Sequence, residues 1–241
     1  MKKLLLVLSV LALGISLRAQ LTVNDPNAEV REAKNFHAIS VSSAFDVFIS
    51  QGNEEAVAVS ASEEKYRKEI KVEVRDGVLK IGLQNEGKFW KGFDGDKMKL
   101  KAYISFKNID RLTASGACDV RVAGNIKGDD LHLNFSGASD LKEGTITAKK
   151  LTVDVSGASD INISGTADQL QLDVTGASNF KGYDLAVDYC DVHATGASTI
   201  NITVNKELSA RATGASDIHY KGDGLIRDIK TSGASNVTKR S

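Results

Sequence analysis

The sequence has little proline and little cysteine, and each shortage excludes a class of protein. One proline in 241 residues is far below the usual share of about 5%, and two cysteines are too few for a disulfide framework. Basic and acidic residues are equal in number, at 31 each, which excludes the basic surface that nucleic-acid binding needs. Aromatic residues are few, at 6%, but 41% of the residues are hydrophobic. We therefore expect a folded protein that does not bind nucleic acid.

Long hydrophobic runs are absent except at the start of the chain. Two lysines precede an apolar run from Leu4 to Leu17, and Ala19 is a small residue suited to cleavage. The run is shorter than the roughly 20 apolar residues of a transmembrane helix. Residues 1–19 therefore predict a secretory signal, with an uncleaved anchor as the alternative, and no later segment predicts a membrane span. Removing the signal takes away three of the 31 basic residues and no acid, so the exported chain carries a net charge of −3.

Glycine is plentiful, and most of it belongs to a repeat. The motif is Ser/Thr-Gly-Ala-Ser/Cys, mostly followed by Asp or Asn and then a hydrophobic residue. The glycines of its seven copies are Gly116, Gly137, Gly157, Gly176, Gly196, Gly214 and Gly233. They are 18–21 residues apart, a spacing typical of repeat proteins. Apolar residues lie two and four positions before each glycine, and another apolar column begins after the turn. This alternation predicts two short strands per repeat, joined by the Gly-Ala-Ser turn.

A rung of two short strands cannot bury its apolar face alone, but stacked rungs can. The repeat therefore predicts an all-β fold, a parallel β-helix or β-solenoid whose two sheets are joined by the Gly-Ala-Ser turns. Further glycines predict a second corner in many rungs: Gly124, Gly144, Gly165, Gly182 and Gly222. The asparagine and leucine signature of leucine-rich repeats is absent, and a propeller blade would need about 40 residues.

The first half of the chain predicts the same fold with additions. Ser42–Ile49 is a degenerate copy of the repeat, and Asp76-Gly77 is a tight-turn dipeptide. Ser62 begins a capping pattern for a single helical turn. Other stretches alternate like strands: residues 56–60, 70–75, 78–83 and 99–106. We expect an extension over residues 20–34 and one solenoid domain over 35–241, with an inserted aromatic loop at 85–98 and regular repeats over 116–241.

Several of these features are shared with a known family. They are Phe45-Asp46-Val47 followed by Gln51-Gly52, the stretch 72–83 around Asp76-Gly77, and the Ser-Gly-Ala-Ser-Asp turns. Over residues 35–240 the chain resembles the head GIN domain family, exported autotransporter adhesins common in Bacteroidetes. The resemblance implies a right-handed β-helix of the pectin-lyase type and a role in adhesion. The catalytic residues of β-helix enzymes are not matched.

A column of acidic residues follows the turn and is a candidate cation site. Asp119, Asp140 and Asp160 would stack on consecutive rungs, where their carboxylates could bind calcium. The alternative is that each carboxylate accepts a hydrogen bond from a turn N–H. Asn179 and Thr199 continue the column, which favours turn chemistry. The Ser and Thr residues beside the glycines recur in every copy, which indicates hydroxyls that complete the turns, not a nucleophile.

A second cluster is predicted on the outward face. Asp154 and Asp173 share a column on adjacent rungs with His193, and Asp191 lies two residues before His193. Carboxylates beside a histidine are what a glycan hydrolase needs, whereas the alternative is a solvated strand face. The other histidines share no column with His193.

The aromatic loop and the cysteines complete the candidates. Phe89, Trp90 and Phe93 could form an exposed binding platform, or they could cap an end of the solenoid. Cys118 and Cys190 are about four rungs apart, roughly 20 Å, beyond the ~7 Å limit for a disulfide. We expect two unpaired, buried thiols.

These observations favour an exported, non-catalytic binding or adhesion protein that engages a cell-surface protein or glycan and needs no cofactor. One alternative is a polysaccharide-active β-helix enzyme, a lyase or hydrolase. The other is a structural envelope protein that associates with itself through the ends of the solenoid.

Overall fold

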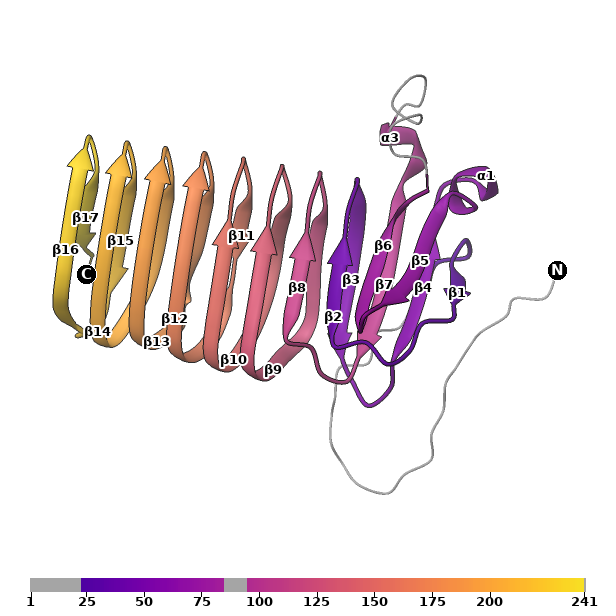
Figure 1. The fold of residues 1–241 in the computed structure, drawn as a ribbon, viewed down its shortest axis with the longest axis horizontal. Coiled ribbons are helices and arrows are strands. Elements are labelled where there is room, and N and C mark those ends of the chain that lie inside the picture. The colour runs from indigo at the N-terminus through magenta and orange to yellow at the C-terminus, as the bar shows by residue number, and fades with distance from the viewer. Residues whose placement is uncertain (1–22, 85–94, 241) are drawn as a thin grey trace.

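The fold is a stack of flattened rungs along one axis. A computed structural model describes residues 23–84 and 95–240. The rungs follow one another from the indigo N-terminal part to the yellow C-terminal end, and each folds back at the top of the view (Figure 1). They form a β-solenoid of about six turns. The predicted all-β solenoid is therefore confirmed.

The elements fall into an irregular N-terminal part and a regular stack. The N-terminal part contains β1 (Glu29–Arg31), β2 (Ala38–Val41), β3 (Phe45–Gln51), β4 (Ala56–Ser60), α1 (Glu64–Arg67), β5 (Ile70–Arg75), β6 (Val78–Leu83), α3 (Gly95–Met98), β7 (Leu100–Phe106) and β8 (Arg111–Ala114). The regular stack contains β9 (Asp119–Phe135), β10 (Asp140–Val155), β11 (Asp160–Asn162), β12 (Ser164–Gly176), β13 (Asn179–Gly196), β14 (Thr199–Gly214), β15 (Asp217–Lys221), β16 (Leu225–Gly233) and β17 (Asn236–Lys239).

Each regular rung has two strand segments that face each other across the core. We call the segments before the glycine corners the first sheet and those after them the second sheet. Both sheets pair in parallel between successive rungs. The strands β9, β10, β13 and β14 pass through the second corner without a break, so hydrogen bonds join all strands into one 17-stranded sheet. In these four rungs the second corner is therefore part of one continuous strand, whereas the sequence predicted two separate strands.

The corner glycines stack directly on one another. All seven have φ between 77° and 91°, a left-handed conformation that costs glycine little. A Cβ at Gly176 would lie 2.4 Å from the carbonyl oxygen of Gly157, so the corner also has no room for a side chain. Ser43, with φ of 79°, lies beneath Gly116 at the head of this column. This confirms that residues 42–49 are a degenerate copy of the repeat.

The second corner is less regular than the sequence predicted. Gly124, Gly165 and Gly222 adopt positive φ, as expected for corner glycines. Gly144 and Gly182 do not adopt positive φ, and both lie beside shifts in strand register. Gly144 and Gly182 are therefore suited to these bulges by their small size, not by a positive φ.

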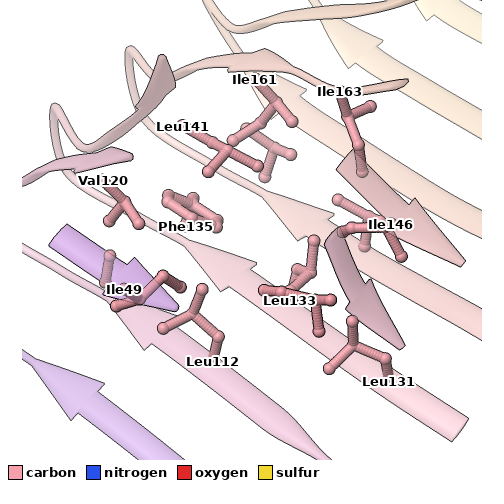
Figure 2. Packing of buried hydrophobic residues seen from close by; sticks show 14 of the residues in the cluster. Ile49, Leu112, Val120, Leu131, Leu133, Phe135, Leu141, Ile146, Ile161 and Ile163 are labelled. Carbon is pink, nitrogen blue, oxygen red and sulfur yellow. The ribbon is translucent and has the colours of Figure 1, made fainter. Parts of the chain in front are cut away.

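The core lies between the two sheets. Figure 2 shows Val120, Phe135 and Leu141 packed in this space, and none of them is more than 1% exposed. Serines occupy the inside of the glycine corner and are buried as well. The hydroxyl of Ser178 lies 3.2 Å from the carbonyl oxygen of Thr175 and accepts the N–H of Ser159 at 3.3 Å. These hydroxyls complete the turns, as the sequence predicted.

The two ends of the solenoid differ. At the N-terminal end, α1 places Tyr66 against the core, where it is 8% exposed. The helical turn was predicted correctly, but its N-cap is Glu63, which makes no side-chain cap. The hydroxyl of Ser62 donates instead to the carbonyl oxygen of Lys97 at 2.6 Å. At the C-terminal end, every residue of β16 is exposed, including Leu225 at 77%.

Candidate binding surface

The outward face of the first sheet gathers the predicted polar cluster. Side chains alternate along a strand, so residues three and five positions before each glycine point outward. The register pairs Asp154 with Asp173, Asp173 with His193 and, two positions earlier, Gln171 with Asp191. The four predicted residues therefore lie on one patch of three adjacent rungs.

The patch is held by contacts between histidines and carboxylates. Nδ1 of His193 lies 3.0 Å from Oδ1 of Asp173, and Nε2 lies 3.6 Å from Oδ1 of Asp191. Asp154 contacts Nε2 of His132 at 2.5 Å. His132 pairs directly with Thr152 and reaches Asp154 on the diagonal. A comparison of residues in one column of the repeat misses this contact, because His132 and Asp154 belong to different columns. Diagonal neighbours on adjacent strands nevertheless lie within reach of long side chains.

An exposed aromatic ring adjoins this patch. Tyr189 is 47% exposed and precedes Asp191 by two residues, so both point to the same side of β13. The ammonium of Lys206 lies 5.5 Å from the centre of its ring. The ring offers an apolar face beside hydrogen-bonding groups, a combination that suits a polar partner with apolar faces. The sequence signal for Tyr189 was its outward place next to the buried Cys190.

The stacked aspartates of the second sheet are neutralised by neighbouring side chains. Lys142 lies 3.2 Å from Oδ1 of Asp119 and 2.6 Å from Oδ2 of Asp140, and its hydrogen bond with Asp140 raises its pKa. Lys181 lies 3.6 Å from Asp160. The described residues contain no group of three His, Cys, Asp or Glu that could hold a metal ion. Lysine ammonium groups thus occupy the positions beside these aspartates where a calcium ion was considered from the sequence.

Hydrogen bonds also link these aspartates between rungs. Oδ1 of Asp140 accepts the backbone N–H of Asp160 at 2.7 Å, and the amide of Asn179 donates to Oδ1 of Asp160 at 2.7 Å. The donors come from the following rung, not from the turn that carries each aspartate. The column therefore joins successive rungs.

Some of the remaining candidates lie within the described residues and others outside them. Cys118 and Cys190 are free and buried, as predicted, and burial raises the pKa of both thiols. Phe89, Trp90 and Phe93 lie outside the described residues. The end of their loop, α3, places Met98 in the core at 6% exposure. Whether the aromatic residues cap or bind stays a prediction.

The family assignment follows from the comparison with known proteins. The family model described as "Putative auto-transporter adhesin, head GIN domain" matches residues 35–224. The chain belongs to the head GIN domain family. No curated protein matches this head GIN domain protein. Within residues 23–84 and 95–240, no helix is long and apolar enough to cross a membrane.

Solved structures from Bacteroides and Parabacteroides species share the fold of this head GIN domain protein. A "putative adhesin" from Bacteroides fragilis has a TM-score of 0.81 at 19% identity, covering 88% of this chain and 96% of that one. A "putative lipid binding protein" from Parabacteroides distasonis has a TM-score of 0.66 at 20% identity, covering 90% and 98%. A "putative adhesin" from Parabacteroides merdae has a TM-score of 0.64 at 20% identity, covering 89% and 95%.

Proposed function

We propose that this head GIN domain protein is an exported, non-catalytic adhesin that binds a cell-surface glycan or protein. The predicted signal over residues 1–19 supports export. The family description and the names of two similar structures support adhesion. The binding surface is the outward face of the first sheet around Tyr189 and His193.

The arrangement of this face carries the proposal. Tyr189 supplies an exposed ring, and the patch of Asp173, Asp191 and His193 supplies half-exposed hydrogen-bonding groups. These groups lie on rungs held in register by continuous strand pairing. A rigid polar surface with an aromatic ring loses little conformational entropy when it binds.

A glycan array probed with the purified protein tests the proposal. We expect retained glycans whose binding falls at least tenfold in Tyr189→Ala, because loss of stacking costs about 1.4 kcal/mol or more. Asn201→Ala, on the second sheet, is the matched control and should bind normally. If a glycan is retained but Tyr189→Ala binds as tightly as the unchanged protein, this face is not the binding surface.

The same array distinguishes adhesion from hydrolysis. We expect retained glycans to remain intact, because Asp154 and Asp173 lie on an open strand face that does not exclude water from a bound sugar. Cleavage that disappears in Asp154→Asn or Asp173→Asn would favour the polysaccharide-active enzyme.

Self-association is a second candidate function, favoured by the exposed last rung. Leu225, Ile226 and Ile229 are 77%, 43% and 38% exposed. A second copy could pair antiparallel along β16 about Ile229, which would place Asp228 opposite Lys230 of the other copy. Such a contact is self-complementary in charge and closes as a two-fold dimer.

A further inference from the structure

An open cavity of about 510 Å³ lies at the second corner, away from the outward face of the first sheet. Its volume falls within the range of about 300–1,000 Å³ found for small-molecule sites. Residues of β9, β10, β12 and β13 line it, together with the short break between β11 and β12. Its walls include the carboxylates of Glu143 and Asp184.

Irregular strand pairing surrounds this cavity. The register of β10 on β9 shifts on both sides of Glu143, and that of β13 on β14 shifts between Gly182 and Ala186. Bulges of this kind redirect side chains and are common beside functional sites. Gly144 contributes to the floor, where a Cβ would lie 3.3–3.4 Å from Leu141 and Val122. The regular strand pairing of the repeat is therefore interrupted at the part of the second corner where the cavity lies.

The hydroxyl donors of the cavity are already used within the protein. The hydroxyl of Ser164 donates to the carbonyl oxygen of Gly144 at 3.3 Å. The hydroxyl of Thr145 lies 3.1 Å from Oγ of Ser164. Because the proton of Ser164 is committed to Gly144, Thr145 must donate to Ser164. Both hydroxyl protons are then occupied, and the oxygen of Thr145 keeps its capacity to accept.

Several hydrogen-bond acceptors in the same cavity have no partner within the described residues. The amide nitrogen of Asn125 donates to Oγ1 of Thr147 at 2.9 Å, whereas its oxygen Oδ1 is buried and has no hydrogen-bond partner. Glu143 and Asp184 form no ion pair with any residue in the described ranges. Carboxylates only accept hydrogen bonds when ionised. No Lys, Arg or His is among the residues that line the cavity, so its two carboxylates face no positive charge within the lining.

We propose that this cavity binds an amino sugar that carries a free ammonium group. The ammonium would supply positive charge and three donors to Glu143 and Asp184, and a sugar hydroxyl would donate to the oxygen of Thr145. A metal ion fits less well, because no group of three His, Cys, Asp or Glu that could hold one occurs in residues 23–84 and 95–240. The site is separate from the adhesive face around Tyr189, so either proposal can fail alone.

Isothermal titration calorimetry on the purified protein tests this site. The probes are the trisaccharide of glucosamine, its N-acetylated counterpart, spermidine and calcium chloride. We expect the glucosamine trisaccharide to bind, and the N-acetylated form to bind at least tenfold more weakly because acetylation removes the charge. Glu143→Gln combined with Asp184→Asn should weaken binding at least tenfold. Asp168→Asn, which removes an exposed carboxylate outside the cavity lining, should leave it unchanged.

Other results would overturn the assignment. Spermidine binding as tightly as the trisaccharide would show that the sugar hydroxyls contribute nothing. Calcium binding that the double substitution abolishes would identify a cation site instead. Absence of glucosamine binding, or binding that only Tyr189→Ala weakens, would also exclude the cavity as an amino-sugar site. In the last case the adhesive face would remain supported.

Discussion

At the scale of single residues, the corner glycines decide whether one rung can stack on the next. Each combines a left-handed φ with a close approach to the carbonyl oxygen of the glycine below it. A side chain at these positions is therefore opposed both by backbone strain and by contact with the backbone of the preceding rung.

Gly176→Ala should lower the free energy of unfolding by about 3 kcal/mol. Left-handed φ costs an L-residue about 1–2 kcal/mol, and the added Cβ would lie 2.4 Å from the carbonyl oxygen of Gly157. Gly128→Ala is the control, because its φ is not positive and its nearest contact would be 3.8 Å. Denaturant unfolding followed by circular dichroism measures both. Equal effects would show that the corner tolerates a side chain.

The residues of the first-sheet patch show which parts of a site a repeat makes predictable. Asp154, Asp173 and His193 share a column because each lies three positions before its corner glycine, so their proximity follows from counting. His132 joins them only on a diagonal, which depends on side-chain length as well as register. The outward place of Tyr189 follows from its position next to Cys190, but the extent of its exposure is known only from the structure.

At the scale of elements, the N-terminal end is protected by α1. This short helix lies at the end of the stack where the chain begins (Figure 1), and Tyr66 is its buried residue. Solenoids need such caps, because a terminal rung otherwise exposes its apolar face.

Tyr66→Ala should destabilise the protein by about 3 kcal/mol, because it removes a buried aromatic side chain from the cap. Tyr189→Ala is the matched control, since Tyr189 is 47% exposed, and it should cost less than about 1 kcal/mol. Thermal or denaturant unfolding of both variants provides the comparison. A loss below 1 kcal/mol for Tyr66→Ala would mean that α1 does not cap the core.

The elements predicted best were those set by local chemistry. The hairpin of β5 and β6 follows from the Asp76-Gly77 turn, and both strands have the predicted bounds. The second corner was predicted less well, because Gly144 and Gly182 take their conformations from register shifts between neighbouring rungs. The amino-sugar cavity lies among these irregularities, so the repeat pattern gave no signal for it.

At the scale of the whole molecule, the two ends are unequal. The N-terminal end carries α1, whereas β16 leaves Leu225 exposed at the other end. Exposed strand edges pair readily with other chains. Antiparallel pairing of β16 with β16 of a second copy uses that edge in both copies, so association through it gives a closed dimer instead of a filament.

Light scattering across concentration should therefore show the mass rising from monomer toward dimer and no further. Leu225→Asp should keep the protein monomeric, because it places a charge in the contact. Val30→Asp is the control, since Val30 is 71% exposed at the capped end, and it should not change the association. Larger assemblies, or a dimer that only Val30→Asp disrupts, would contradict this arrangement.

The parallel pairing of rung on rung has a mechanical consequence. The interstrand hydrogen bonds run along the long axis of the stack, nearly perpendicular to the strands, and each rung contacts only its neighbours. Tension applied between the two ends of the stack therefore passes through every interface between rungs, and each interface can separate without the others. The molecule should yield by peeling single rungs from its open end while the capped end keeps its structure.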